Sequence, residues 1–373
     1  MAKQKTRADG LVEIKRRVDG RDRHFYGRTK REAENKYKQA LIEAANVAEH
    51  GEPFRDVADA FWAWKEPRIK YGTRRGYQHK VEVAKTWFGQ VGMRDVTATD
   101  ISRELARMAA AGHAYKTVSG QKSVLSMIWR YWCENMEGDT NPVDLVKLPQ
   151  GLPQKQRRAP TDEEVDLIRR NPQGFGLCAS FMLYAGLRLG EVMALQKRDI
   201  LGDSVSVTKA VVWHNNQPVI DTPKTKNAVR TVPLLAPLQE AIGHRLDGMA
   251  QDEYLFGGAT PMTKAAYENA WLQYCAALGL VHDTGKRDKT GRMDKNGNPL
   301  YKPVMAANFT AHQLRHEFAS VLVRCGVSVQ VAKEIMGHAD ILTTQRWYAE
   351  AKAQDIDAAA QKLNLYYGRS KVV

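Results

Sequence analysis

Residues 141–158, NPVDLVKLPQGLPQKQRR, contain three prolines, one glycine and a basic run. Prolines and glycine at this density interrupt both helices and strands, so the segment predicts a linker, with residues 148–158 as the connection itself. The chain has 373 residues, more than a single hydrophobic core usually organises. We therefore expect a multidomain protein, with one part before this linker and another after it.

Residues 52–147, before the linker, show the apolar rhythm of helices. Apolar residues recur with a 3.6-residue period in four segments, and Thr99 or Asp100 is placed to cap the third. Aromatic residues of the last segment, such as Trp129 and Trp132, could stack on bases, but this spacing favours a place in a core. The sequence thus predicts a helical domain over 52–147. The four helices are expected at Phe54–Trp64, Thr73–Phe88, Asp100–Ala111 and Tyr115–Glu134.

The first fifty residues predict a small basic module. Leu11–Val18 and Arg23–Thr29 alternate apolar and polar residues, and Asp19-Gly20 between them is a strong hairpin signal. Lys30–Ala48 then carries apolar residues at helical spacing. The module has 13 basic and 8 acidic residues, so it is a candidate for DNA binding. The candidate contact residues are Lys15, Arg16, Arg17, Arg21, Arg23, Arg28 and Lys30.

Residues 159–351, after the linker, mix helices with short strands. Thr161 and Glu164 form a capping-box pattern that starts a helix, and Gly186 suits the left-handed residue that ends the next one. Strand-like alternation follows over 204–232, and the basic, glycine-rich segment 282–303 predicts an exposed loop or ribbon. The whole chain is therefore expected to be mainly α with small β elements. Further helices are expected at Phe175–Tyr184, Pro237–Met249, Thr263–Leu278, Thr310–Cys325 and Ser328–Met336.

The net charge restricts the kind of partner. Lys and Arg number 56 against 42 Asp and Glu, which leaves a formal charge of +14. A surplus of this size favours a polyanionic partner, most simply nucleic acid, although a basic solvated surface without a partner remains open. The four cysteines form no CxxC or Cys/His cluster, and no apolar run approaches the length of a membrane span. We expect a cytoplasmic protein that has no contact with membranes.

Four separated pieces of residues 159–351 carry groups suited to one task. The first two are AGLRLGEVMAL, where Arg188 follows the helix-ending glycine, and TPKTKNAVRTVPL, which holds Lys224 and Lys226 at a strand turn. In TAHQLRHEF, helical spacing places His312 and Arg315 one turn apart. The fourth piece is MGHADILTTQRWYAE, with His338 after a helix-ending glycine and Tyr348 ten residues later.

Together these side chains supply what metal-free phosphoryl transfer needs. Arginine forks bind the non-bridging oxygens of a phosphodiester and stabilise the charge that develops there. Histidine can accept the proton of a tyrosine, lysine can protonate a leaving oxygen, and tyrosine can act as a covalent nucleophile. The sequence shows neither a carboxylate cluster for Mg²⁺ nor the phosphate-binding pattern GxxxxGK[ST]. We therefore expect no metal and no cofactor.

Each piece taken alone has a simpler interpretation. AGLRLGE could be a helix–turn–helix corner with a surface arginine, and Lys224 and Lys226 could be solvated turn residues. His312 and His316 have zinc-ligand spacing, but the glutamate of HExxH is missing between them. Tyr348, beside a tryptophan, could belong to a core. The combination in this order is much harder to obtain by chance.

The four pieces together resemble the tyrosine recombinase (phage integrase) family, whose pattern is Arg, Lys, His-x-x-Arg, His/Trp and Tyr in that order. The resemblance covers about residues 158–351, and residues 52–147 are similar to the family's core-binding domain. The segment FYGRTKREAENK resembles the small three-stranded arm-binding domain of lambda-type integrases. The resemblance implies domains at 1–50, 52–147 and 159–351, and a tail at 352–373 for contacts between protomers. It implies that the catalytic residues are Arg188, Lys224, His312, Arg315, His338 and Tyr348.

Two details of the catalytic pieces depart from the family pattern or stay open. The usual family tyrosine follows the Gly-His histidine by nine residues, where this chain has Trp347, so Tyr348 is one residue late. In the hairpin piece, Lys224 and Lys226 would lie on the same side of a strand. We favour Lys224 as the catalytic lysine from its place after Thr-Pro, and Lys226 as a DNA contact.

The resemblance implies a site-specific recombinase that integrates or excises a mobile element, such as a phage, on the DNA of a bacterial host. Its expected partners are double-stranded attachment sites, a homotetramer on DNA, and a host DNA-bending protein or excisionase. Two alternatives remain open at this point. A type IB topoisomerase would use the same chemistry to relax DNA, and a DNA-binding regulator would keep the fold without the chemistry.

Overall fold

The computed structural model describes residues 10–136, 138–154, 158–221, 229–293 and 298–337. The chain divides into two compact units, Met1–Gln156 and Arg157–Val373. Each unit is described by itself below. No described helix combines the length and the hydropathy that a membrane span requires.

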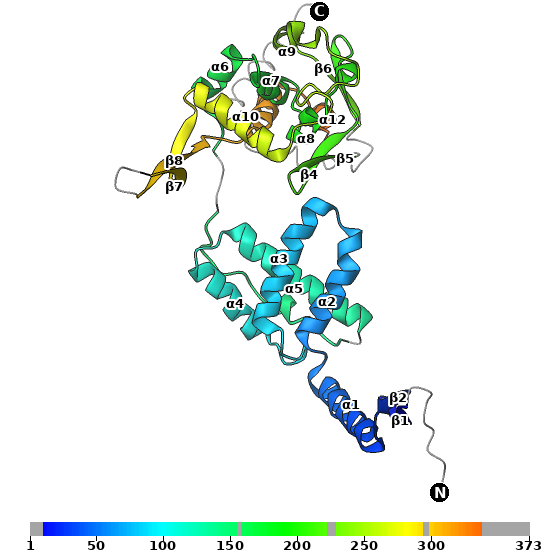
Figure 1. The fold of residues 1–373 in the computed structure, drawn as a ribbon. Helices are drawn as coiled ribbons and strands as arrows, with labels where there is room; N and C mark the ends of the chain where they lie inside the picture. The colour runs from blue at the N-terminus through cyan, green and yellow to red at the C-terminus, as the bar shows by residue number, and fades with distance from the viewer. Residues whose placement is uncertain (1–9, 137, 155–157, 222–228, 294–297, 338–373) are drawn as a thin grey trace, which may run out of the picture. The chain divides into compact units, whose positions relative to one another are not determined.

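Unit 1 begins with the expected hairpin and helix (Figure 1). Strands β1 (Val12–Val18) and β2 (Arg21–Gly27) pair antiparallel, and the turn between them uses positive φ angles at Asp19 (47°) and Gly20 (71°). Helix α1 (Lys30–His50) follows, and its N-cap Thr29 accepts a hydrogen bond from the backbone N–H of Glu32. Within residues 10–50 the structure describes these two strands, and the third strand expected from the resemblance is not among them.

The rest of unit 1 is helical, which confirms the prediction for this region. Trp129 and Trp132 are almost completely buried beside Phe54 and Phe61, so these tryptophans belong to the core. The predicted cap of the third helix is wrong. The N-cap is Thr97, whose hydroxyl accepts from the N–H of Asp100 while the Asp100 carboxylate accepts from the N–H of Thr97. The elements are α2 (Phe54–Lys65), η1 (Glu66–Arg68), α3 (Tyr71–Phe88), α4 (Ala98–Ala110), α5 (Tyr115–Asn135) and η2 (Pro142–Leu145).

Unit 2 is built around α7 (Gly176–Tyr184), which is buried along nearly its whole length and contacts α6, α8, α9 and α11 (Figure 1). A helix that is apolar all round belongs in the interior of a domain. The remaining helical elements surround it or connect the strands. They are α6 (Asp162–Arg170), α8 (Leu189–Met193), η3 (Lys197–Asp199), α9 (Ala236–Ile242), η5 (Gly243–Leu246), α10 (Lys264–Ala277), α11 (His312–Arg324) and α12 (Val329–Met336).

The strands in the described part of unit 2 form three antiparallel pairs. The pairs are β3 (Ser204–Val207) with β6 (Arg230–Pro233), β4 (Ala210–His214) with β5 (Gln217–Asp221), and β7 (Val281–Met293) with β8 (Pro299–Ala307). A turn at Asn215-Asn216 joins β4 to β5, and both residues have positive φ. The segment predicted as an exposed loop or ribbon is the β7–β8 pair.

Two predicted helices of unit 2 have different boundaries. The helix expected at Pro237–Met249 ends at Ile242, because Gly243 leaves the helical conformation with φ of 39°. The helix expected at Thr310–Cys325 begins at His312 instead. Thr310 is a donor here, since its N–H and its hydroxyl both bind the side-chain oxygen of Gln313.

Candidate active site: arginines around Glu191

Arg188 is aimed by the junction between α7 and α8. Gly186 has φ of 61°, and a Cβ there would lie 2.3 Å from the Phe318 ring, so a glycine is required. Arg188 then becomes the N-cap of α8, where its backbone N–H and its guanidinium NH1 each donate to the Glu191 carboxylate at 2.8 Å. The Arg188 side chain remains 37% exposed, so part of its guanidinium faces solvent.

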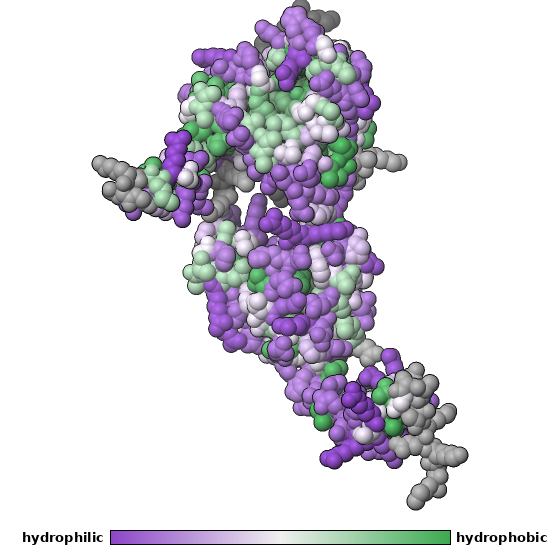
Figure 2. Space-filling view, in the orientation of Figure 1, coloured by the Kyte–Doolittle hydropathy of each residue, from purple (hydrophilic) through white to green (hydrophobic). Residues whose placement is uncertain are grey.

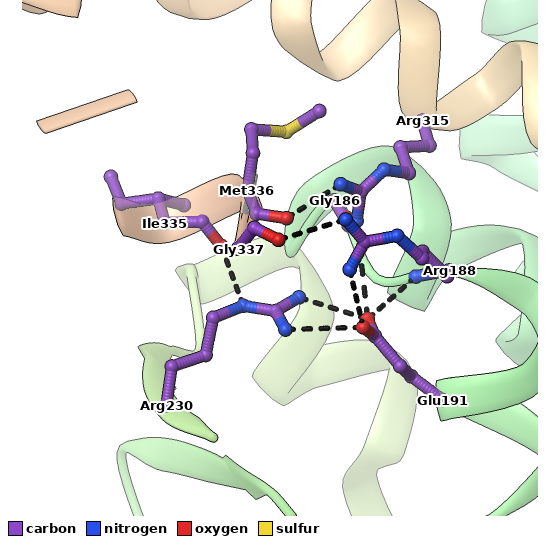
Figure 3. Close-up of polar contacts among 8 residues, drawn as sticks. All are labelled: Gly186, Arg188, Glu191, Arg230, Arg315, Ile335, Met336 and Gly337. Carbon is purple, nitrogen blue, oxygen red and sulfur yellow. Dashed lines mark hydrogen bonds and ion pairs between the residues drawn. The ribbon is translucent and has the colours of Figure 1, made fainter. Parts of the chain in front are cut away.

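Glu191 is the buried centre of this cluster (Figure 3). Its side chain is 6% exposed and accepts hydrogen bonds from Arg188 and from both terminal nitrogens of Arg230, while Arg315 lies 3.9 Å away. Burial raises the pKa of Glu191, but the hydrogen bond and charge of Arg230 and the charge of Arg188 outweigh it and lower the pKa to about 2. The carboxylate is therefore ionised at neutral pH and holds the guanidinium groups together.

Arg315 approaches from α11 and is buried, with 2% exposure. Its guanidinium donates to the backbone oxygens of Gly186 and Met336. Burial and the charge of Arg188 lower the pKa of Arg315 to about 9, and the guanidinium still keeps its charge at neutral pH.

Three guanidinium groups bind three successive carbonyl oxygens at the C-terminal end of α12. Arg230 donates to Ile335 at 2.8 Å, Arg315 to Met336, and Arg188 to Gly337 at 2.8 Å (Figure 3). The last carbonyls of a helix lack intrahelical partners and carry partial negative charge, which explains why cations collect there. The next residue in the chain is His338. The cluster therefore holds the backbone that leads into the His338–Tyr348 segment.

The structure brings Arg188 and Arg315 together, although they lie far apart in sequence. Lys224, Lys226, His338 and Tyr348 lie outside the described residues. His312 is exposed at the start of α11, and its ring packs at 4.8 Å against the ring of His316. The part of the chain that the structure describes holds no group of three or more His, Cys, Asp or Glu side chains that could bind a metal.

Sequence reasoning missed Glu191 and Arg230. Both lie within the motifs singled out above, and a signal for each was present. Glu191 is the third residue of α8, where a carboxylate can bind back to the N-cap backbone. Arg230 precedes buried Val232 by two residues on β6, so strand alternation turns it toward the same inward face.

The candidate DNA-binding residues of unit 1 lie on an exposed surface. Lys15, Arg16 and Arg17 project from β1, and their contacts are local, such as the 2.7 Å ion pair of Lys15 with Asp22. The others are equally exposed, and ion pairs in such positions contribute little to stability. These others are Arg21, Arg23, Arg28 and Lys30.

The lowered pKa of Glu191 predicts a pH-dependent contribution to stability. A carboxylate whose pKa falls from 4.5 in the unfolded chain to about 2 stabilises the folded state above pH 4.5 and loses that effect as the pH falls toward 2. We expect Glu191→Gln to lower the free energy of unfolding by about 3 kcal/mol at pH 7, with the difference from wild type roughly halved at pH 3. Urea unfolding at both pH values measures this, and a difference that does not change with pH contradicts it.

Known proteins resemble this chain in sequence. The sequence profile of the Phage integrase family matches residues 176–355. The chain is 24% identical over 376 residues to the "Tyrosine recombinase XerC-like" protein of Caldanaerobacter subterraneus, covering 92% of this chain and 91% of that protein. It is 25% identical to the "ICEBs1 integrase" of Bacillus subtilis, covering 74% of this chain and 73% of that protein.

Solved structures share the fold. An integrase of transposon Tn1549 in complex with transposon right end DNA aligns with a TM-score of 0.63 at 20% identity, covering 82% of this chain and 99% of that one. A lambda integrase dimer bound to a core site aligns with a TM-score of 0.56 at 17% identity, covering 92% and 93%. From the family profile and the relatives, we conclude that residues 176–355 of this chain form a domain of the tyrosine recombinase (phage integrase) family.

Proposed function

We propose that this chain is a site-specific DNA recombinase that integrates or excises a mobile element through a 3′-phosphotyrosine at Tyr348. The observation that supports it best is the convergence of Arg188 and Arg315, from two distant segments, next to the backbone that enters His338. A partly exposed, charged guanidinium beside a buried one is suited to binding a phosphodiester that arrives from solvent.

The proposed chemistry exchanges one phosphodiester for another. Arg188 and Arg315, assisted by His338, bind the non-bridging oxygens of the scissile phosphate, and the contacts described for Arg188 use only some of its five N–H donors. The Tyr348 oxygen bonds to phosphorus as the bond to the 5′ oxygen breaks. His312 takes the tyrosine proton, and Lys224 protonates the departing 5′ oxygen. A different 5′ hydroxyl then reverses the step, so no energy source is needed.

The proposed partners are duplex attachment sites and further copies of this chain, in the cytoplasm of a bacterial host. The net charge of +14 favours DNA, and the lambda integrase has been solved as a tetramer bound to a Holliday junction. We assign residues 1–50 to arm-type sites, 52–147 to the core site, 148–158 to the linker, 159–351 to catalysis and 352–373 to contacts between protomers. An excisionase or a DNA-bending protein of the host would act at the accessory sites.

The covalent intermediate gives the direct test. On a nicked suicide substrate that carries a candidate attachment site, the protein should form an adduct that resists detergent, in the presence of EDTA. The DNA should be attached through its 3′ end and leave a free 5′ hydroxyl. A requirement for a divalent cation would contradict the proposal, and relaxation of supercoiled plasmid without any specific site would favour a topoisomerase.

A shortened chain that begins at Gly51 serves as a control in the same assay. The hydrophobic core of the helical part of unit 1 draws its buried residues from Phe54 onward and contains none from β1, β2 or α1. The end of α1 adds polar contacts only, since Arg94 donates to the carbonyl oxygens of Val47 and Ala48. This chain should form the adduct at the core site while losing protection of arm-type sites in footprinting. Loss of the core-site adduct would contradict the assignment of residues 1–50.

A further inference from the structure

The β7–β8 ribbon, Val281–Met293 paired with Pro299–Ala307, is the most exposed element of unit 2. Every described residue from His282 to Met293 and from Pro299 to Pro303 is exposed. Figure 1 shows the ribbon extending away from the helices of its unit, and its surface is mostly hydrophilic in Figure 2. An isolated two-stranded ribbon is only marginally stable in water, so a partner that covers it would stabilise it.

Positive charge dominates the described part of the ribbon. Its two carboxylates, Asp283 and Asp288, are outnumbered by five cations, and Asp283 is already paired with Arg287 at 2.9 Å. The catalytic groups proposed above lie in other elements, so this charge has no role in the proposed chemistry. The cations are Lys286, Arg287, Lys289, Arg292 and Lys302.

The strand register sorts side chains onto two faces. Arg287 pairs with Pro303 and Lys289 with Tyr301, so these four residues share one face. Asp288 pairs with Lys302 on the other face. The face of Arg287 and Lys289 thus combines two cations with an aromatic ring that is 54% exposed.

Apolar groups lie at both ends of that same face. Along β8, Pro299 and Met305 alternate in step with Tyr301, so they lie on its face. Pro299 pairs with Met293 and Met305 with Asp283, each beyond an irregularity in the register of β7. Met293 is 70% exposed and Met305 37%. This combination of groups suits a nucleic acid. The cations can bind its phosphates, while the aromatic ring and the thioether groups can contact sugars and base edges in its grooves.

We propose that the β7–β8 ribbon is a DNA-binding element that contacts the duplex DNA of an attachment site. Its cations bind backbone phosphates, while Tyr301 and Met293 lie against the groove. An antiparallel two-stranded ribbon has the width that the major groove admits. The inference rests on the proposed function, because the ligand is the same DNA. A second copy of this chain is the competing occupant. The ribbon has little continuous apolar surface of the kind that forms the core of a protein–protein interface, which disfavours this alternative.

Salt dependence of binding tests the charge contribution. The full-length chain with Lys286→Gln, Arg287→Gln, Lys289→Gln and Arg292→Gln is compared with a charge-preserving control, Lys286→Arg, Arg287→Lys, Lys289→Arg and Arg292→Lys. Affinity for a fluorescent duplex of arbitrary sequence is measured against NaCl concentration. If all four cations bind phosphates, the slope of log affinity against log salt becomes shallower by about 3.6 in the Gln variant and stays unchanged in the control. Tyr301→Ala should lower affinity without changing the slope.

The adduct assay separates this inference from the proposed function. If the chain forms no adduct at all, the proposed function fails while the salt slope still reports on the ribbon. An unchanged slope in the Gln variant overturns the inference. If higher-order assembly is lost at the same time, the ribbon is assigned to protein contacts instead.

Discussion

Tyr348→Phe is expected to abolish covalent protein–DNA adducts while changing DNA affinity by no more than about twofold. The substitution removes one oxygen, the atom that the mechanism requires as nucleophile, and leaves every cation that would bind phosphate. A suicide-substrate assay on denaturing gels measures the adduct, and a gel-shift titration measures affinity. Tyr366→Phe and Tyr367→Phe are the matched controls, because they remove the same atom from the C-terminal tail and should retain adduct formation. An adduct that persists in Tyr348→Phe contradicts the assignment.

The neighbouring Trp347 cannot replace this nucleophile. An indole carries a single N–H donor and no oxygen, so it offers no group that could form a phosphodiester. Tyr348 is the only tyrosine between His338 and residue 351. The proposed nucleophile therefore stands one residue later than in the usual family pattern, and Tyr348→Phe tests whether this later tyrosine reacts.

Arg315→Gln is expected to lower the single-turnover cleavage rate by about a thousandfold, since it removes a charge-assisted donor from the developing phosphorane. Arg315 is also buried against Glu191, Gly186 and Met336, so its loss leaves buried acceptors without this donor. We expect a loss of stability of about 3 kcal/mol for breaking such a network. Cleavage is measured with quench-flow on the suicide substrate, and stability by thermal unfolding.

Two further variants separate catalysis from folding. Arg315→Lys keeps the charge but cannot span two carbonyl oxygens with a planar fork, so it should remain more stable than Arg315→Gln and still cleave slowly. Arg324→Gln lies on the same helix, where Arg324 binds Glu317 near the surface, and it should cleave at the wild-type rate. If Arg315→Lys and Arg315→Gln fold and cleave at the wild-type rate, Arg315 does not act on the phosphate.

Local signals in the sequence predicted much of the secondary structure. The capping box of Thr161 and Glu164 and the left-handed glycine Gly186 involve residues within four positions, so a short stretch of sequence contains the whole interaction. The cap of α4 was misassigned because Thr97 and Thr99 both precede the same apolar rhythm. Only the hydrogen bonds between Thr97 and Asp100 distinguish them.

The contacts within the site were harder to predict from the sequence, because they join residues that lie far apart along the chain. Arg188 and Arg315 were found because each stands inside a recognisable motif. Glu191 joins Arg230 across 39 positions, and Arg188 reaches Gly337 across 149, distances at which spacing carries no information. The β7–β8 ribbon presented a different difficulty. Both of its faces are exposed, so no apolar alternation marks it as a strand pair.

The residue to which the DNA becomes attached identifies the nucleophile. The wild-type adduct is digested with nuclease and trypsin, and the peptide that retains a nucleotide is identified by mass spectrometry. Trypsin cuts after Arg346 and Lys352, so we expect a nucleotide on Tyr348 in the peptide Trp347–Lys352. A nucleotide on the peptide Leu363–Arg369, which holds Tyr366 and Tyr367, or on any other residue, would contradict it.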